Sequence, residues 1–176
     1  MAMIPRNILE RARMANRNTF LYTHDGFAYC YADGSCMEPA RNAGVGVWFG
    51  HNHIANISEP LSVPGTNNRA ELLALLYAIH AAKASGLQCL EIRSDSKYAI
   101  QCVTDWLPKW KNNNWQTCAC TSVENQVEIR AIDEARSNMN VRFEWVPGHS
   151  GDFGNGAADA LAKAGATESL RMYRGY

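Results

Sequence analysis

Short apolar runs separated by turn residues characterise the first half of the chain. Three such runs, at residues 27–31, 44–49 and 53–57, are rich in aromatic and β-branched side chains, and Gly, Asn and Pro lie between them. Runs of this length and composition are typical of β-strands, and short connections between them favour antiparallel pairing. The pattern therefore predicts an antiparallel three-stranded meander that begins near Phe20.

A helical periodicity replaces the strand pattern after Thr66. Leucine and isoleucine positions from Leu72 to Ile79 form a broad apolar face, Thr66 is suited to cap the helix, and Gly86 is placed to end it. The elements expected further along are a strand at 89–93, a helix from about Ser96, a Trp-rich loop, a helix at 123–137, a strand at 141–146 and an Ala-rich helix from about Asn155.

The order of these elements predicts an α/β fold. Strands alternate with helices in the second half, which indicates parallel pairing there. We expect a mixed five-stranded sheet, three antiparallel strands followed by parallel strands, with helices on both faces. A chain of 176 residues suits one compact domain. We assign the domain to residues 20–166, with a flexible basic arm at 1–19 and a C-terminal tail at 167–176.

The N-terminal arm owes its basic character to four arginines against one glutamate. The arginines are Arg6, Arg11, Arg13 and Arg17, and the glutamate is Glu10. Three interpretations of this arm stay open: a solvated tail, an organelle-targeting segment, and a segment that grips nucleic acid.

Composition narrows the class of protein. Hydrophobic residues make up 47% of the chain and charged residues 19%, which is ordinary for a globular protein. No apolar run reaches the roughly 18 to 20 residues of a membrane span, so we expect a soluble intracellular protein with no membrane partner, in nucleus, cytoplasm or mitochondrion. The formal net charge is zero. Any binding of nucleic acid must therefore come from local basic patches.

The six cysteines carry no framework-like spacing, and no secretory signal precedes them. Reduced thiols are therefore expected rather than disulfides. Cys118 and Cys120 suggest half of a zinc site, but no second Cys or His pair lies nearby to complete four ligands. We do not expect zinc.

Four acidic residues occupy positions that surface solvation explains poorly. Asp33 and Asp95 each follow an apolar strand run, and strand ends in α/β sheets are where ligands collect. Glu71 and Asp159 lie in the early turns of two helices. Each acid alone has an ordinary explanation as a turn or helix-dipole residue. As a group they suggest a site for Mg²⁺ or Mn²⁺, because converging carboxylates repel one another unless cations neutralise them.

His149 adds a group that titrates near neutral pH, in the glycine-containing loop from Val146 to Gly151. The glycines permit motion of this loop. A hinged proton shuttle or an aid to product release suits that setting. A loop histidine with no task is the alternative.

Several motifs in this order and spacing resemble the type 1 ribonuclease H family. They are Tyr31-Ala-Asp-Gly-Ser35, Thr66-Asn-Asn-Arg-Ala-Glu71, Ser94-Asp-Ser96, the segment from Trp106 to Trp115, Trp145-Val-Pro-Gly-His-Ser-Gly151 and Asn155-Gly-Ala-Ala-Asp159. The similarity covers roughly Phe20 to Ala166, and the histidine loop looks closer to eukaryotic than to bacterial members.

The resemblance implies a ribonuclease H-like fold and an endonuclease that hydrolyses the RNA strand of RNA–DNA hybrids, leaving 3′-hydroxyl and 5′-phosphate ends. It implies a two-metal-ion mechanism. Two Mg²⁺ ions, with Mn²⁺ as a substitute, would be held by Asp33, Glu71, Asp95 and Asp159. Asp33 and Asp95 would contact both ions, Glu71 one site and Asp159 the other, while His149 would assist turnover.

The Trp-rich segment offers aromatic faces interleaved with Lys109 and Lys111, a combination that grips a nucleic-acid backbone without reading its sequence. The resemblance makes this segment a basic protrusion that holds the DNA strand. The substrate-binding residues that it implies are Tyr98, Trp106, Trp110 and Lys111 in the channel, Cys36, Asn67 and Asn68 in the minor groove, and Thr66 and Asn125 in a DNA-phosphate pocket.

Two departures from the family qualify these expectations. Val63-Pro-Gly65 stands where animal members place an arginine, which predicts looser binding of the DNA strand. Residues 1–18 are too short for the separate hybrid-binding domain of many eukaryotic relatives, so we expect reduced processivity. We expect a monomer without an obligate protein partner. Two alternatives stay open, the nuclease portion of a retroelement polyprotein and a catalytically dead hybrid-binding module.

Overall fold

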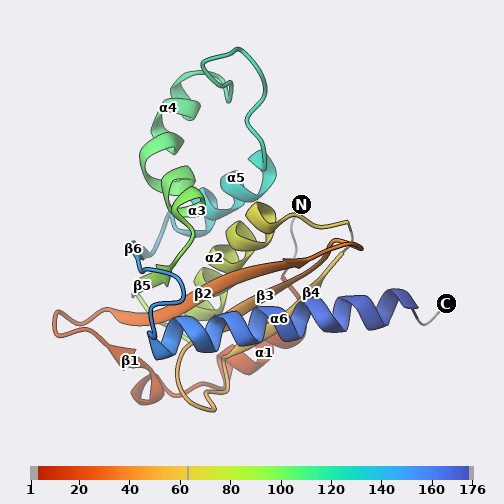
Figure 1. Cartoon of the computed structure of the whole chain (residues 1–176). Coiled ribbons are helices and arrows are strands. Elements are labelled where there is room, and N and C mark those ends of the chain that lie inside the picture. The colour runs from red at the N-terminus through yellow and green to blue at the C-terminus, as the bar shows by residue number, and fades with distance from the viewer. Residues whose placement is uncertain (1–3, 63, 175–176) are drawn as a thin grey trace.

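The computed structural model describes residues 4–62 and 64–174 of the chain (Figure 1). The helices are α1 (Arg6–Arg13), α2 (Asn67–Ala84), α3 (Lys97–Gln101), α4 (Leu107–Asn112), α5 (Gln126–Ala135) and α6 (Phe153–Arg174), with a 3-10 turn at Arg17–Thr19 and a π-helical turn at Cys102–Trp106. The strands are β1 (Leu21–Tyr22), β2 (Ala28–Met37), β3 (Asn42–Trp48), β4 (Ile57–Leu61), β5 (Cys89–Ser94) and β6 (Asn140–Trp145).

The strands form one mixed sheet in the order β4-β3-β2-β5-β6. Neighbours are antiparallel from β4 to β2 and parallel from β2 to β6, which confirms the predicted fold class. The two-residue strand β1 pairs with β2 outside this path. β5 pairs with β2 only as far as Tyr31, so within the described part of the chain the second half of β2 has β3 on one side and no strand on the other.

Helices cover both faces of the sheet, as predicted. A side chain at Gly46 of β3 would collide with Ala158 and Ala162 of α6, whereas a side chain at Gly34 of β2 would collide with Ala70 and the backbone of Glu71 in α2. Gly46 pairs with Asp33, the residue next to Gly34. Because successive strand residues point to opposite faces, α6 and α2 lie on opposite sides of the sheet, and Figure 1 shows this arrangement.

α2 is the central core helix. Its residues are buried without interruption from Ala70 to Ile79, so its apolar surface extends all round rather than along one stripe. The side chain of Thr66 accepts a hydrogen bond from the backbone N–H of Arg69 at 3.1 Å, and Gly86 follows the helix with φ +78°. Both ends therefore match the predicted cap and terminator.

The described part of the N-terminal segment is not a flexible arm, and that expectation was wrong. Residues Arg6–Arg13 form α1, whose Ile8 and Ala12 are fully buried against the core. The hydroxyl of Ser85, just after α2, donates to the carbonyl of Ala12 at 2.8 Å. The apolar residues on one face of α1 account for this packing. The helix is too short for their periodicity to be recognised in the sequence.

The end of the chain also differs from the expected tail at 167–176. α6 runs without interruption to Arg174, and the buried hydroxyl of Ser169 donates to the carbonyl of Leu61 at 2.9 Å. Gly165 lies so close to Glu59 that a side chain there would meet the backbone of β4. The C-terminal half of α6 is therefore part of the domain that covers β4.

Two segments differ from the predicted secondary structure. Residues 53–56 form a turn rather than a strand, because Asn56 accepts from the N–H of Phe49 at 2.7 Å and His53 accepts from the N–H of Ala55 at 3.1 Å. The Trp-rich segment is helical through Cys102–Trp106 and α4 instead of forming a loop. Residues 102–125, here called the protrusion, project from the body of the domain (Figure 1).

Among the described residues no helix combines the length and the apolar character that crossing a membrane requires.

Candidate active site

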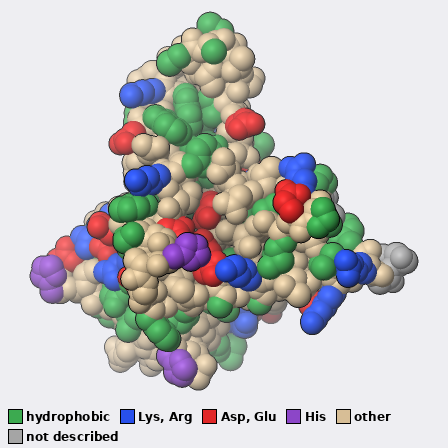
Figure 2. All heavy atoms as spheres, viewed as in Figure 1, with side chains coloured by type: hydrophobic (Ala, Val, Ile, Leu, Met, Phe, Trp, Pro, Cys, Tyr) green, Lys and Arg blue, Asp and Glu red, His purple; other side chains and the backbone are tan. Residues whose placement is uncertain are grey.

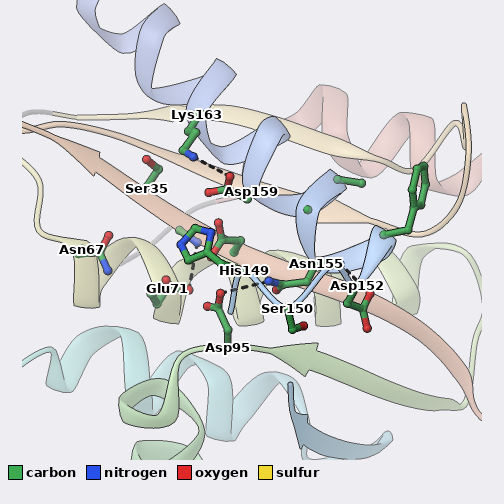
Figure 3. Close-up of a pocket in the computed structure, with 16 residues that line it drawn as sticks. Ser35, Asn67, Glu71, Asp95, His149, Ser150, Asp152, Asn155, Asp159 and Lys163 are labelled. Carbon is green, nitrogen blue, oxygen red and sulfur yellow. Dashed lines mark hydrogen bonds and ion pairs between the residues drawn. The ribbon is translucent and has the colours of Figure 1, made fainter. Parts of the chain in front are cut away.

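A cavity of about 850 Å³ opens between β2, α2, the end of β5 and the first turns of α6. Figure 2 shows acidic side chains gathered in a hollow at the foot of the protrusion, with a histidine beside them. The polar residues that line it are Asp33, Ser35, Asn67, Glu71, Asp95, His149, Ser150, Asp152, Asn155, Asp159 and Lys163 (Figure 3).

Asp33 lies inside β2 and not at a strand end, which corrects the predicted position. β2 continues past it to Met37, and Asp33 pairs with Gly46 of β3. Since β5 pairs with β2 only up to Tyr31, Asp33 sits just beyond the point where the sheet opens. The opening leaves room for side chains from α2 and β5 to reach the same place.

Glu71 enters this opening from α2. Its Oε2 accepts a hydrogen bond from the backbone N–H of Gly34 at 3.0 Å, and the carboxyl group is buried. The N–H group is available because none of the described strands pairs with β2 on that edge at this position. The missing side chain of Gly34 allows α2 to approach closely enough for the contact.

Asp95 follows β5 directly, as predicted, and three neighbours fix its environment. Its carbonyl accepts from the indole Nε1 of Trp145 at 3.2 Å, and its Oδ2 accepts from Nδ2 of Asn155 at 3.2 Å. A side chain at Gly148 would stand 2.8 Å from Oδ2 of Asp95, so the loop that carries His149 passes against this carboxylate. The hydroxyl of the next residue, Ser96, caps α3 by accepting a hydrogen bond from the N–H of Ala99 at 3.1 Å.

Three of the four predicted acids converge within ligand distance. Asp33, Glu71 and Asp95 each offer a carboxylate oxygen, and these oxygens lie within 4.8 Å of one another. Asp159 is outside this group, but it lines the same cavity from α6 (Figure 3). Its Oδ2 accepts from the ammonium of Lys163 at 2.7 Å. The structure thus brings three carboxylates together and holds the fourth beside them in an ion pair.

Burial and mutual repulsion both disfavour the charged forms of these acids, and burial is the larger cause. Burial, followed by the charges of Asp95 and Asp159, raises the pKa of Asp33. Burial and then the charges of Asp33 and Asp95 raise the pKa of Glu71. A cation at the cluster would favour the charged forms of both groups. The carboxylates supply hard oxygen donors that lie close together, and their charged forms are unfavourable without a cation. Such a group of donors fits a divalent metal ion such as Mg²⁺.

His149 lies on the loop after β6, exposed and with φ +54°. Residues other than glycine adopt this left-handed conformation infrequently. The residue lines the cavity, so its imidazole has access to whatever occupies the site.

The residues implied in substrate binding fall into two groups. Thr66, Asn67 and Asn68 are exposed at the N-terminus of α2, where Asn67 lines the cavity and the Thr66 hydroxyl caps the helix. Cys36 lies near the end of β2 and is partly buried. Val63, in the segment where animal members of the family place an arginine, lies outside the described residues. In the same segment, the carbonyl of Gly65 accepts a hydrogen bond from the guanidinium of Arg41 at 2.9 Å.

The second group surrounds the protrusion. Nδ2 of Asn125 donates to the hydroxyl of Tyr98 at 3.1 Å, and the rings of Tyr98, Trp106 and Trp110 follow one another with centroids 6.2 and 5.6 Å apart. Lys111 is turned away from this aromatic row, because its ammonium binds Asp133 of α5 at 2.9 Å. Lys109 instead lines a groove of about 350 Å³ together with Trp106 and Trp110.

Three residues near the cluster were missed in the sequence. Asn155 and Lys163 lie four residues before and after Asp159, a spacing that places all three on one face of a helix and could have revealed them. The third is Asp152, whose Oδ1 accepts from the N–H groups of Gly154 and Asn155 at 3.0 and 3.2 Å. It therefore caps α6 at the edge of the cavity.

Comparisons with known proteins agree with this arrangement. The model of the RNase H family, described as RNase H, matches residues 27–167. The chain is 38% identical over 164 residues to Ribonuclease H1 of Homo sapiens, covering 92% of this chain and 57% of that protein. It is 44% identical over 142 residues to Ribonuclease H of Schizosaccharomyces pombe, covering 78% of this chain and 52% of that protein.

A similar fold occurs among solved structures. LC9-RNase H1, described as a type 1 RNase H with the type 2 active-site motif, is 25% identical with a TM-score of 0.64, covering 80% of this chain and 72% of that one. The chain spans little more than half the length of the two relatives named above.

Proposed function

We propose, since this chain belongs to the RNase H family, that it is an endonuclease which hydrolyses the RNA strand of RNA–DNA hybrids and leaves 3′-hydroxyl and 5′-phosphate ends. The observation that carries the proposal is the convergence of Asp33, Glu71 and Asp95 within 4.8 Å at an open cavity. Three carboxylates without a cation would repel one another there, so the site is suited to bind a cation that neutralises them.

Two Mg²⁺ ions are the proposed cofactors, with Mn²⁺ as a substitute. Asp33, Glu71 and Asp95 would hold them, joined by Asp159 at the α6 side of the cavity. When bound, such ions polarise a phosphodiester and an attacking water and neutralise the charge that develops on the departing oxygen. Until a metal ion binds, the ammonium of Lys163 forms an ion pair with the carboxylate of Asp159.

The groups around the cluster suit recognition of a ribose. The exposed side chain of Asn67 lines the cavity next to Glu71, so a hydroxyl group that donates and accepts hydrogen bonds finds both kinds of partner there. Asn68 and Cys36 are proposed to contribute on the minor-groove side. His149, exposed on its loop, is proposed to move a proton or assist product release during turnover.

The protrusion is proposed to hold the DNA strand. The aromatic row of Tyr98, Trp106 and Trp110 offers faces for sugars and bases, and Lys109 adds charge beside it. Thr66 and Asn125, at the N-termini of α2 and α5, are proposed to meet a DNA phosphate. Helix N-termini favour anions, which supports this assignment. We expect the protein to act as a monomer with looser DNA-strand binding.

Cleavage of matched labelled duplexes tests the proposal. RNA–DNA, RNA–RNA and DNA–DNA substrates are incubated with the protein in Mg²⁺ and in EDTA, and the end groups of the products are analysed. Cleavage of the RNA strand of the hybrid alone, only with the metal, is expected. Asp95→Asn should abolish cleavage while hybrid binding survives. Hybrid binding without cleavage by the wild-type protein would instead favour a catalytically dead binding module.

A further inference from the structure

Asp152 connects three parts of the molecule at the edge of the cavity. Its Oδ1 accepts from the first free N–H groups of α6, at Gly154 and Asn155. Its Oδ2 accepts from the hydroxyl of Tyr31 on β2 at 3.3 Å. One carboxylate therefore ties the start of the helix that carries Asp159 to the strand that carries Asp33.

Tyr31 is itself held in place from two sides. Its hydroxyl accepts a hydrogen bond from Nη1 of Arg93 at 3.1 Å, and Arg93 binds Glu91 at 2.7 Å. The ring lies directly under the first turn of α6, since a side chain at Gly154 would collide with its edge. The anchor for Asp152 is thus a tyrosine whose ring and hydroxyl are both fixed by packing and hydrogen bonds.

Asn155 connects the first turn of α6 to Asp95, one of the proposed metal ligands. The residue is 5% exposed, and its Nδ2 donates to Oδ2 of Asp95 at 3.2 Å. Among the described residues its buried Oδ1 has no hydrogen-bond partner. A buried amide oxygen without a partner is destabilising, and the hydrogen bond that Nδ2 makes at the other end of the same amide offsets part of this cost. That end orients Asp95.

We propose that Asp152 is a positioning residue for the metal site, which fixes the first turn of α6 so that Asn155 holds Asp95 in the orientation that binds a divalent cation. The inference rests on the proposed function, because it assigns a role within that metal site. Residues that orient the ligands of a metal typically change its affinity about 10- to 100-fold when they are removed. A residue that only caps α6 would change stability alone.

Binding of Mg²⁺ to the intact protein without substrate, measured by titration calorimetry, is the main test. Asp152→Ala and Asn155→Ala are each expected to weaken Mg²⁺ binding about 10- to 100-fold. Tyr31→Phe removes the hydroxyl, and with it the hydrogen bonds to Asp152 and from Arg93, and should weaken Mg²⁺ binding by about 2- to 10-fold. At saturating Mg²⁺ the KM for the hybrid should stay at the wild-type value in all three variants, because none of these side chains is assigned to hybrid binding.

Asp152→Asn separates hydrogen bonding from charge. Asparagine caps helices about as well as aspartate, and its Oδ1 still accepts from the two N–H groups. Its Nδ2 takes the place of Oδ2 and can donate to the Tyr31 hydroxyl, which donates to Asp152 in the wild type. Mg²⁺ affinity within about threefold of the wild type is therefore expected. A loss as large as that of Asp152→Ala would show that Asp152 acts through its charge and would overturn the positioning role.

Ser169→Ala is the matched structural control. It removes a buried hydrogen bond of α6 to Leu61 at the far end of the same helix, roughly 25 Å from Asp152. Its thermal stability should fall while its Mg²⁺ affinity stays unchanged. Equal loss of affinity in this control, or unchanged affinity in Asp152→Ala and Asn155→Ala, would overturn the inference. A wild-type protein that neither binds Mg²⁺ nor cleaves hybrid would contradict the proposed function instead.

Discussion

Glu71 of α2 accepts a hydrogen bond from the backbone N–H of Gly34 in β2 at 3.0 Å. This contact joins the core helix to the strand that carries Asp33, and it exists because β5 stops pairing with β2 three residues earlier. The geometry of the acidic cluster therefore depends on a glycine that contributes no side chain of its own.

Replacing Gly34 with alanine should disrupt both the packing of α2 and the acidic cluster. The new methyl group would collide with backbone atoms of Ala70 and Glu71, which cannot rotate out of the way. We expect a loss of about 1–3 kcal/mol in the free energy of unfolding, or more, measured by urea denaturation. Gly156→Ala on α6, where a side chain would meet no atom of another element within 4 Å, is the control and should not lower stability; helix propensity predicts a gain of up to about 1 kcal/mol.

Removing the charge of Asp33 should stabilise the metal-free protein at alkaline pH. The pKa of Asp33 is raised in the fold, so between about pH 4 and that raised value the folded protein keeps a proton that the unfolded chain has released. The free energy of unfolding therefore falls as the pH rises through this window. Asp33→Asn should gain on the order of 1–3 kcal/mol at pH 8 and little below about pH 3, where the carboxyl group is protonated in both states.

Chemical denaturation in EDTA across this pH range measures the effect. Asp105→Asn, at an exposed acid outside the cluster, is the control and should change little. Addition of Mg²⁺ should stabilise the wild-type protein at pH 8 more than Asp33→Asn. A variant less stable than the wild type at pH 8 would contradict the repulsion described for the cluster.

His149 should affect turnover without affecting metal binding. His149→Ala is expected to lower kcat by about tenfold or more, the effect of losing a positioned proton-transfer group, while Mg²⁺ affinity stays the same. His149→Asn separates the imidazole from the loop conformation, because asparagine tolerates positive φ. Comparison of single-turnover with steady-state rates shows which step slows. Full activity in both variants would leave the histidine without the proposed task.

The two lysines of the protrusion should differ in their contribution to hybrid binding. Lys111 is engaged with Asp133, whereas Lys109 lies with Trp106 and Trp110 at the groove. Lys109→Ala should weaken hybrid affinity more than Lys111→Ala and should reduce the slope of log affinity against log salt by about one. Fluorescence anisotropy in EDTA measures both. The opposite ranking would indicate that the hybrid displaces Asp133 from Lys111.

The sequence predicted elements whose local signals agree with their tertiary setting. Thr66 and Ser96 cap their helices as their residue types indicate. The leucine-rich face of α2 and the apolar run of β5 lie in the core. The acidic cluster was predicted because several carboxylates stood at comparable places in successive elements, although Asp159 lies beside the group rather than within it.

Other features depend on contacts between distant segments. Asp33 precedes a glycine and looks like a turn residue, yet pairing with Gly46 of β3 keeps it within a strand. The Trp-rich segment is polar along its length, but buried Val103 and Leu107 hold it as helix against its neighbours. Asp152 becomes a cap and a tether only when Tyr31 lies beneath α6. Local pattern alone carries no information about such partners.

The docking of α1 changes how the basic N-terminal residues have to be probed. Cutting the chain before Phe20 would strip Ile8 and Ala12 from the interior and uncover the end of α2, so reduced hybrid affinity in a shortened protein would report damage to the folded domain. Exchanging exposed Arg6 and Arg13 for glutamine leaves that interior intact. Electrostatic attraction to nucleic acid is then measured on an undamaged molecule.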